Sequence, residues 1–382
     1  YEELGLSIRS STLLVVLISL PVTAVFLLVP AELVGLLSND AQAVAYGAAY
    51  LQVVGFGIPF AGLNLVGSRV LVGADDAYTA MQVRAGGAVV NIVLNAIFIF
   101  GLELGVRGAA LGTVLSNVIA VTAFAIGITQ GRAPLLGEFP VTIAARGDYL
   151  DGSTLRDLVR IGTPVGARNL VWTAAEFPML AILASFGTST VAAFVIARRI
   201  WGIMNTPGWG FGLASSSLSG QALGQAKEEL AEAYGRDIIR FAVAVYAVSA
   251  VIVAVFAEPL VRLFVDNPAQ NLETVRIAVN LLYAACLAVL FQGVSGAAIG
   301  PLDASGDTRV PFLSQFLGMF GGSIPLAYIG SVTALGHWGI FLAFVAETTI
   351  PAAINYWRFR TGTWKEVSRE FRPEQGESTA VD

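Results

Sequence analysis

Residues 10–31 read SSTLLVVLISLPVTAVFLLVPA, and this stretch lies between Arg9 and Glu32 without one charged side chain. A helix needs about 20 mostly apolar residues to cross the hydrocarbon core of a bilayer. Residues 10–31 therefore predict a membrane-spanning helix, and further stretches of this kind follow along the chain.

The overall composition supports the same interpretation. Hydrophobic residues make up 55% of the 382 residues and charged residues only 13%, whereas a soluble domain carries roughly 25% charge. A soluble core cannot hide this much apolar surface, so the bilayer must cover the rest. We predict an all-α integral membrane protein.

Charge-free stretches predict eight membrane-spanning helices. They lie between Arg9 and Glu32, Asp40 and Arg69, Arg84 and Glu103, Arg107 and Arg132, Arg240 and Glu258, and Arg276 and Asp303, and as a pair, split near 330–338, between Arg309 and Glu347. Two more spans, within 161–186 and 190–218, are interrupted by Arg168, Glu176, Arg198 and Arg199, which gives a total of ten. Residues 132–160 contain Pro134, Pro140 and several charges, and they predict a cytosolic linker with a short surface helix.

The distribution of positive charge predicts the orientation. With the loops assigned alternately to the two sides, 15 Lys and Arg residues fall on one side and 3 on the other. Cytoplasmic loops carry the excess of Lys and Arg. The first side, which includes the C-terminal tail, is therefore expected in the cytoplasm.

Several functional classes are disfavoured. The chain has one cysteine, Cys286, and one histidine, His337, which excludes an internal disulfide and makes a His/Cys metal cluster improbable. The sequence contains no Asp-rich pair, His cluster or phosphate-binding loop, so we do not expect an enzyme. Neither lysine lies in a predicted span, which argues against a retinal protein.

The chain also repeats itself. Residues 31–37 resemble residues 258–264 at an offset of 227 (258 − 31), while Asp76 and Gly105 match Asp307 and Gly336 at an offset of 231 (307 − 76; 336 − 105). Four early spans therefore pair with the last four. The two spans within 161–218 have no partner, and the chain begins with Tyr1 rather than Met. If the halves were once equal, two helices would precede Tyr1 and a complete version would have twelve. Parallel repeats around a central site are a transporter architecture.

Several motifs carry a resemblance to a known family. They are GQALGQ at 220–225, LDASGDTR at 302–309, NIVLN at 91–95 followed by GVRGAALGT at 105–113, RIGTP at 160–164 and GTW at 362–364. In this order and spacing the sequence resembles the multidrug and toxic compound extrusion (MATE) transporters, with the family's first two helices absent.

The resemblance implies a function and a domain organisation. Members export organic, usually cationic, compounds in exchange for Na⁺ or H⁺, with two lobes that rock about a central cavity. The implied regions are an N-lobe at 1–131, a linker at 132–160, a C-lobe at 161–362 and a cytoplasmic tail at 363–382. We expect a monomer in the plasma membrane that handles a small organic substrate, with the coupling ion as its only bound cofactor and no nucleic-acid partner.

Polar groups inside the bilayer are costly and are functional candidates by default. Asn91 and Asn95 are four residues apart and share one helix face. By the resemblance, some members carry a cation-binding acid at the position of Asn95, and Thr113 and Asn64 match the same polar cluster. An amide oxygen can still coordinate Na⁺, although it cannot take up a proton in a useful pH range. The alternative is that both Asn side chains only bridge neighbouring helices.

In the C-lobe, Glu176 is the only carboxylate that this count places well inside a span. Some family members put a cation-binding Glu one turn earlier, where this chain has Trp172, and Gln292 lies near the position of a second acid. Glu176 is a candidate cation ligand, and the alternative is an ion pair with Arg198 or Arg199. We expect Trp172, Gln292, Arg199 and Trp201 at the substrate, and Asp76 and Asp307 as helix caps.

Two other functions stay open. A lipid-linked sugar or polysaccharide flippase of the same fold would favour a basic cavity, for which Arg168, Arg198 and Arg199 are available. The second is a truncated relative that does not transport.

Overall fold

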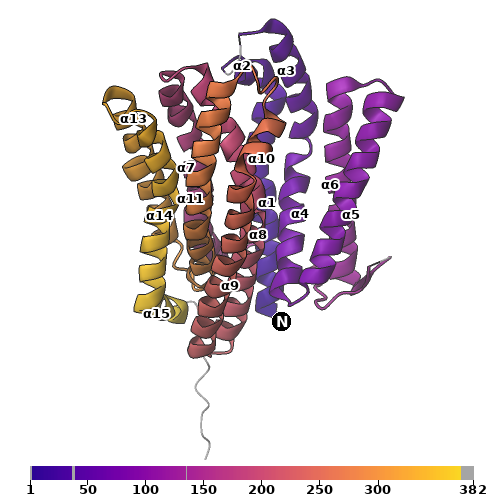
Figure 1. The fold of residues 1–382 in the computed structure, drawn as a ribbon. Coiled ribbons are helices and arrows are strands. Elements are labelled where there is room, and N and C mark those ends of the chain that lie inside the picture. Colours follow the sequence, from indigo (N-terminus) through magenta and orange to yellow (C-terminus); the bar gives the residue numbers. More distant parts are fainter. Residues whose placement is uncertain (1, 37–38, 135, 371–382) are drawn as a thin grey trace, which may run out of the picture. The chain divides into compact units, whose positions relative to one another are not determined.

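The computed structural model describes residues 2–36, 39–134 and 136–370, and it confirms the predicted all-α fold. In chain order the elements are α1 (Glu2–Leu28), α2 (Pro30–Gly35), α3 (Ala41–Gly55), α4 (Ile58–Gly73), α5 (Ala77–Ala96), η1 (Ile97–Gly101), α6 (Gly105–Gln130), β1 (Arg132–Ala133), β2 (Gly137–Glu138), α7 (Gly152–Ala184), α8 (Thr188–Gly224), α9 (Glu228–Val255), α10 (Ala257–Phe264), α11 (Leu272–Ala304), α12 (Arg309–Phe316), η2 (Leu317–Ser323), α13 (Ile324–Val332), α14 (His337–Thr361) and α15 (Thr363–Glu370), where η marks a π-helix (Figure 1).

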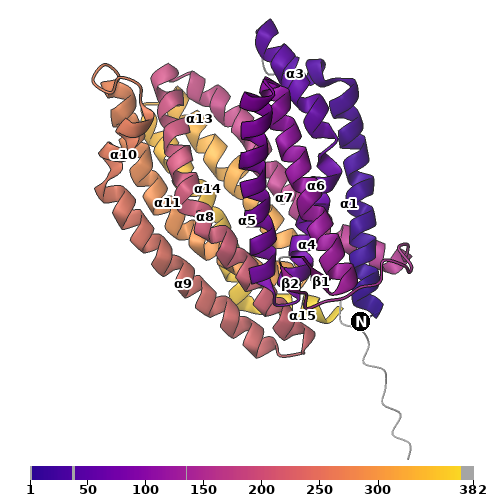
Figure 2. The same ribbon diagram turned by 90° about the vertical axis from the view of Figure 1, so that its right-hand side faces the viewer.

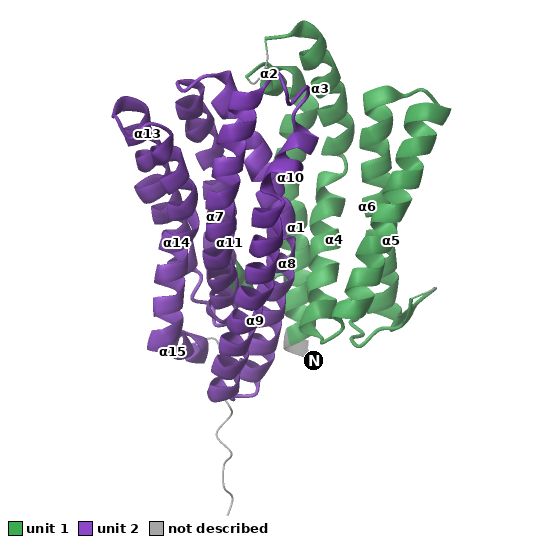
Figure 3. Cartoon of the chain, in the orientation of Figure 1, with its two compact units in different colours: residues 1–159 green, residues 160–382 purple. Residues whose placement is uncertain are grey.

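The chain divides into two compact units, residues 1–159 and residues 160–382 (Figure 3). In unit 1, α4, α5 and α6 pack against one another, and α1 and α3 pack on α4 and α6 respectively. In unit 2, α11 is the central helix and packs against α8, α9 and α14, as Figure 2 shows for α8 and α9. Many small side chains of α11, among them Ala278, Ala284 and Ala288, are fully buried, which lets these helices approach closely.

Among the described residues, seven helices are long and apolar enough to cross a membrane, or eight if one bent pair counts as a single span. They correspond to eight of the ten predicted spans. At the other two predicted positions lie α7 and α8, which are continuous helices of 33 and 37 residues. Their charged side chains, such as Arg168, Glu176, Arg198 and Arg199, dilute the apolar composition of both.

The bent pair is α3 and α4, which meet at an angle of 51°. The charge-free count predicts one span there. The break falls at Phe56 and Gly57, and Pro59 lies in the first turn of α4. Proline cannot donate an amide hydrogen bond to the preceding turn, so a helix bends or restarts at it. In the second half of the internal repeat, at the offset of 231, the positions equivalent to 57 and 59 are Ala288 and Leu290. Both lie within α11, which is continuous there.

The internal repeat is visible in the backbone of both units. The amide of Asp76 donates to the carbonyl of Leu71 at 2.9 Å, and the amide of Asp307 donates to the carbonyl of Leu302 at the same distance. Gly105 and Gly336 stand at the starts of α6 and α14 with φ of +54° and +55°. A side chain disfavours this left-handed conformation, which explains why glycine occupies both places.

The helix expected in the linker of 132–160 is not a separate element in the described part of that range: residues 152–160 form the start of α7. Apart from residue 135, residues 132–151 contain only the β1–β2 pair and non-helical backbone. Pro134 and Pro140 interrupt helical hydrogen bonding there. The segment packs on unit 1: Phe139 is buried, the amide of Ile143 donates to the carbonyl of Ile128 at 2.8 Å, and Arg9 Nε donates to the carbonyl of Asp148 at 2.9 Å.

Asp151 marks the start of α7. Its carboxylate accepts hydrogen bonds from the Ser153 hydroxyl and, at 2.8 Å, from the amide of Thr154. These bonds favour the charged form and lower the pKa of Asp151 to about 2. The predicted cap Asp76 likewise accepts from the amide of Thr79 at 2.9 Å. Asp307 does not cap α12; it binds Arg358 Nε at 2.7 Å instead.

Candidate functional site

Unit 1 holds a cluster of polar side chains between α4, α5 and α6. On α5, Asn95 Nδ2 donates to Asn91 Oδ1 at 3.1 Å. Asn91 Nδ2 in turn lies 3.3 Å from Thr113 Oγ1 and 3.4 Å from Ser116 Oγ, both on α6. The one-turn spacing predicted for Asn91 and Asn95 therefore places both amides against the same face of α6.

The cluster extends to α4. Asn64 Nδ2 donates to Asn117 Oδ1 at 2.9 Å, and Asn117 Nδ2 donates to the carbonyl of Thr113 at 3.0 Å. The structure thus brings together the four unit 1 residues singled out from the sequence, Asn64, Asn91, Asn95 and Thr113. We call these four, with Ser116 and Asn117, the polar cluster.

Two amide oxygens of the polar cluster, Asn64 Oδ1 and Asn95 Oδ1, are buried without a hydrogen-bond partner. An unmet buried acceptor costs about 1–3 kcal/mol. Oxygen atoms of amides, hydroxyls and carbonyls are the ligands that hard cations take. No Asp or Glu occurs in the sequences of α4, α5 and α6. The cluster therefore presents neutral oxygens of the kind that hard cations take, and α4, α5 and α6 offer it no carboxylate to protonate.

Gly112 makes room for the Asn95 amide. A Cβ on Gly112 would lie 3.1 Å from Asn95 Cγ and 3.2 Å from the Asn95 backbone nitrogen, and closer still to Oδ1. The absence of a side chain at Gly112 lets α5 and α6 approach here.

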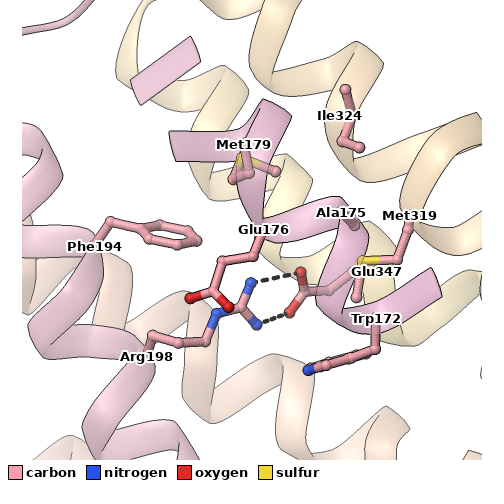
Figure 4. A pocket seen from close by; sticks show the side chains of 9 residues that line it. All are labelled: Trp172, Ala175, Glu176, Met179, Phe194, Arg198, Met319, Ile324 and Glu347. Carbon is pink, nitrogen blue, oxygen red and sulfur yellow. Dashed lines mark hydrogen bonds and ion pairs between the residues drawn. The ribbon is translucent and has the colours of Figure 1, made fainter. Parts of the chain in front are cut away.

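Unit 2 contains a pocket of about 80 Å³ between α7, α8, η2, α13 and α14 (Figure 4). Its walls are formed by Trp172, Ala175, Glu176, Met179, Phe194, Arg198, Met319, Ile324 and Glu347. Trp172 and Glu176 were predicted functional residues, and both face this pocket. Because they belong to unit 2, they form a second centre that does not include the polar cluster.

An ion pair dominates the pocket. Arg198 on α8 binds both oxygens of Glu347 on α14; Nη2 lies 2.9 Å from Oε2, and Nη1 contacts Oε1. The Glu347 side chain is 1% exposed and the Arg198 side chain 25%. A bidentate pair of this kind matches the fork of the guanidinium to a carboxylate.

Four aromatic rings surround the Arg198 guanidinium. Its Cζ lies 4.6 Å from the ring centre of Phe344, 5.0 Å from that of Phe194, and 5.6 Å from those of Trp172 and Trp201. Trp172 and Trp201 stack at 5.7 Å. We call these four rings the aromatic box. Trp201, expected at the substrate, is buried in it.

The structure corrects two expectations about charge. Glu176 is not the only carboxylate inside a helix of the bundle, because Glu347 lies in the middle of α14. The expected ion pair of Glu176 with Arg198 or Arg199 is also wrong, since Arg198 pairs with Glu347. Glu176 is exposed and has no ion-pair partner among the described residues. In Figure 4 its carboxylate points toward the guanidinium that Glu347 holds.

The remaining predicted residues lie outside this pocket. Arg199 is exposed on α8, and Gln292 is half-buried on α11. Arg168 binds Asp303 through two hydrogen bonds, at 3.1 and 2.8 Å. Of the three arginines considered for a basic cavity, two are thus engaged with carboxylates.

Counting charge-free stretches does not identify Glu347 as a residue inside a helix, because Glu347 is the charge that ends the stretch beginning at Arg309. The internal repeat could have found it. Subtracting the offset of 231 from 347 gives Ser116, and subtracting it from Phe344 gives Thr113 (347 − 231; 344 − 231). The same face of α6 and of α14 therefore carries the polar cluster in unit 1 and the ion pair in unit 2.

Comparison with known proteins assigns the family. The MatE family profile matches residues 1–97 and 164–329. The chain is 26% identical over 355 residues to the uncharacterized transporter YisQ of Bacillus subtilis, covering 91% of this chain and 75% of that protein. It is 25% identical over 335 residues to the probable multidrug resistance protein NorM of Thermotoga maritima, covering 86% and 70%.

A solved structure shows the same fold. It is described as the outward-facing conformation of a multidrug resistance MATE family transporter of the MOP superfamily. The TM-score is 0.81 at 22% identity, over 96% of this chain and 84% of that one. The family profile matches well over half of the chain, and the chain belongs to the MatE family of multidrug efflux transporters.

Proposed function

We propose that this transporter exports organic cations by secondary active antiport, and that Na⁺ bound at the polar cluster of unit 1 is the coupling ion. The names of relatives such as the probable multidrug resistance protein of Thermotoga maritima support drug export. On this proposal the protein works as a monomer in the cell membrane, with its C-terminus in the cytoplasm and no cofactor besides the coupling ion.

The observation that carries the choice of ion is the pair of buried, unpaired oxygens of Asn64 and Asn95. Each is an acceptor without a donor. A Na⁺ ion in the polar cluster would give such an oxygen the partner that it lacks, while a proton has no site on a neutral amide in the physiological range. If H⁺ is instead the coupling ion, the residues that would carry it are Glu176 and Glu347 of unit 2.

The flippase alternative receives little support from the charges. A basic cavity needs arginines that are available to an anionic ligand. Arg168 and Arg198 are held by Asp303 and Glu347, so most of that positive charge is already neutralised. Arg199 alone does not make a basic cavity.

The proposal is tested by ethidium efflux from proteoliposomes that contain the purified full chain, under a Na⁺ gradient or an H⁺ gradient applied separately. We expect efflux with the Na⁺ gradient. Asn95→Ala should abolish it, because it removes one unpaired oxygen, and Asn95→Asp should add efflux driven by H⁺.

Asn280→Asp is the matched control, since it makes the same change on an exposed position of α11, outside the polar cluster. It should not introduce H⁺ coupling. The absence of efflux of ethidium and of other organic cations under either gradient would refute the antiporter proposal, and would favour a flippase or a relative that does not transport.

A further inference from the structure

The surroundings of the Arg198 guanidinium have the composition of a receptor for an organic cation. The four rings of the aromatic box lie with their centres 4.6 to 5.6 Å from its Cζ. The buried Glu347 carboxylate supplies the opposite charge. Aromatic faces combined with a carboxylate are what recognises guanidinium and ammonium groups. Here the protein's own arginine occupies that receptor.

The charges of the pocket do not balance. Two carboxylates, Glu176 and Glu347, and one guanidinium, Arg198, line the same cavity. Their formal sum is one negative charge, and Glu176 has no ion-pair partner among the described residues. Charges within the bilayer are stabilised by pairing. One further monovalent cation would balance the pocket.

We propose that the aromatic box and Glu347 bind the compact head group of a monovalent organic cation, and that Arg198 is a resident competitor that moves to Glu176 when this cation binds. This inference rests on the proposed function, because it assigns the cation substrate to residues of unit 2. The exchange raises the number of ion pairs in the pocket from one to two: Arg198 moves from Glu347 to Glu176, and the incoming cation takes its place beside Glu347.

The size of the pocket limits the ligand. About 80 Å³ accommodates a few water molecules. With the volume that the Arg198 guanidinium vacates, it accommodates a guanidinium or a methylated ammonium but not a polycyclic dye. The remainder of a larger substrate would stay outside the pocket.

The backbone and side chains of the pocket wall are compatible with such an exchange. Met319 lies in the π-helical segment η2, and Ile324 follows it directly. Segments of π-helix occur frequently at functional sites. Met179 and Met319 have unbranched side chains that adapt to different occupants.

The direct test is the binding of methylguanidinium chloride to the purified full chain in detergent. Tryptophan fluorescence serves as the readout, because Trp172 and Trp201 are both part of the box. An internal competitor reduces the apparent affinity by the fraction of time that it fills the site. Arg198→Ala should therefore bind methylguanidinium about tenfold more tightly than the native protein, or better.

Arg168→Ala is the matched control, since Arg168 also forms a two-bonded pair, with Asp303, and contributes nothing to the aromatic box. It should bind like the native protein.

A second variant does not depend on how well Arg198→Ala folds. Glu176→Gln changes an exposed side chain without an ion-pair partner, so folding should be preserved. It should weaken methylguanidinium binding severalfold, because Arg198 then has no carboxylate to move to. Arg198→Met/Glu347→Met should bind none.

Three results would overturn the inference: equal binding by Glu176→Gln and the native protein, no tightening in Arg198→Ala relative to Arg168→Ala, or a response of the tryptophans to pH but not to methylguanidinium. Any of these together with intact ethidium efflux would leave the proposed function standing. Binding with the predicted variant pattern but without gradient-driven efflux would support the site and refute the antiporter.

Discussion

Arg198 on α8 and Glu347 on α14 join two helices of unit 2 through a two-bonded ion pair whose carboxylate is almost completely buried. The presence of such a pair does not by itself indicate that it raises the free energy of unfolding, because burying both charges costs desolvation energy. Removing only one partner has a different consequence, because it leaves an uncompensated charge among aromatic rings.

The first prediction concerns this asymmetry. Arg198→Met should lower the free energy of unfolding by about 3–5 kcal/mol, because it leaves Glu347 buried and unpaired. Arg198→Met/Glu347→Met should restore most of it, since both charges are gone. Thermal unfolding in detergent measures the three proteins. A double variant as unstable as the single one would show that the pair itself provides the stability.

The second prediction concerns the coupling ion. If Na⁺ satisfies the oxygens of Asn64 and Asn95, then NaCl should raise the melting temperature of the protein more than choline chloride at equal ionic strength. At a Na⁺ concentration of about 100 times the Kd, the stabilisation is about 2.7 kcal/mol.

Asn95→Ala should remove the Na⁺-specific part of this shift, and Asn280→Asp should keep it. Equal melting temperatures in the two salts, with the native protein, would argue against a Na⁺ site at the polar cluster.

The third prediction concerns the close approach of α5 and α6. Gly112→Ala puts a Cβ against the Asn95 amide and its backbone nitrogen, and overpacking of this kind costs about 1–3 kcal/mol. The displaced amide should also weaken the Na⁺-dependent shift in melting temperature.

Gly86→Ala on α5 is the matched control, because nothing lies within 4 Å of a Cβ at that position. It should be neutral or slightly stabilising, as alanine has the better helix propensity. A Gly112→Ala protein as stable and as Na⁺-responsive as Gly86→Ala would show that the space beside Asn95 is not needed.

The fourth prediction concerns α15. Trp364 is 0% exposed, stacks on Phe359 and donates from its indole nitrogen to the Phe359 carbonyl at 3.0 Å. Lys365 and Arg369 bind Glu232 and Glu228 of α9. Trp364→Ala should lower the free energy of unfolding by about 3–5 kcal/mol, as loss of a buried aromatic side chain does.

Trp357→Ala provides the comparison, since Trp357 is 62% exposed. It should change stability by much less. Proteolysis of α15 in the Trp364→Ala protein, with the rest of the chain intact, would locate the defect; similar unfolding curves for both variants would mean that α15 does not depend on Trp364.

The sequence predicts most of the helices, because an uncharged stretch long enough to cross the bilayer indicates a spanning helix whatever that helix packs against. The bend between α3 and α4 was missed, although Gly57 and Pro59 both indicate it, because counting charges ignores backbone chemistry. No separate linker helix forms before α7 for a related reason: Pro134 and Pro140 interrupt helical hydrogen bonding there, and the helical residues 152–160 belong to α7.

Within the polar cluster, Asn91 and Asn95 could be predicted because they stand one helical turn apart on α5. Asn64 and Thr113 follow only from the family resemblance, and Ser116 and Asn117 were not among the predicted residues. The Arg198–Glu347 pair could not be found in this way, since its partners are 149 residues apart. Which carboxylate holds Arg198 depends on tertiary packing. Only the repeat, which relates Glu347 to Ser116, gave a signal in the sequence.

The uptake of radioactive sodium into ethidium-loaded proteoliposomes measures the antiport of Na⁺ against an organic cation directly. External Na⁺ should enter as ethidium leaves, and Asn95→Ala should stop both movements together. Ethidium efflux that proceeds at the same rate without Na⁺ entry, or sodium entry that Asn95→Ala leaves unchanged, would contradict it.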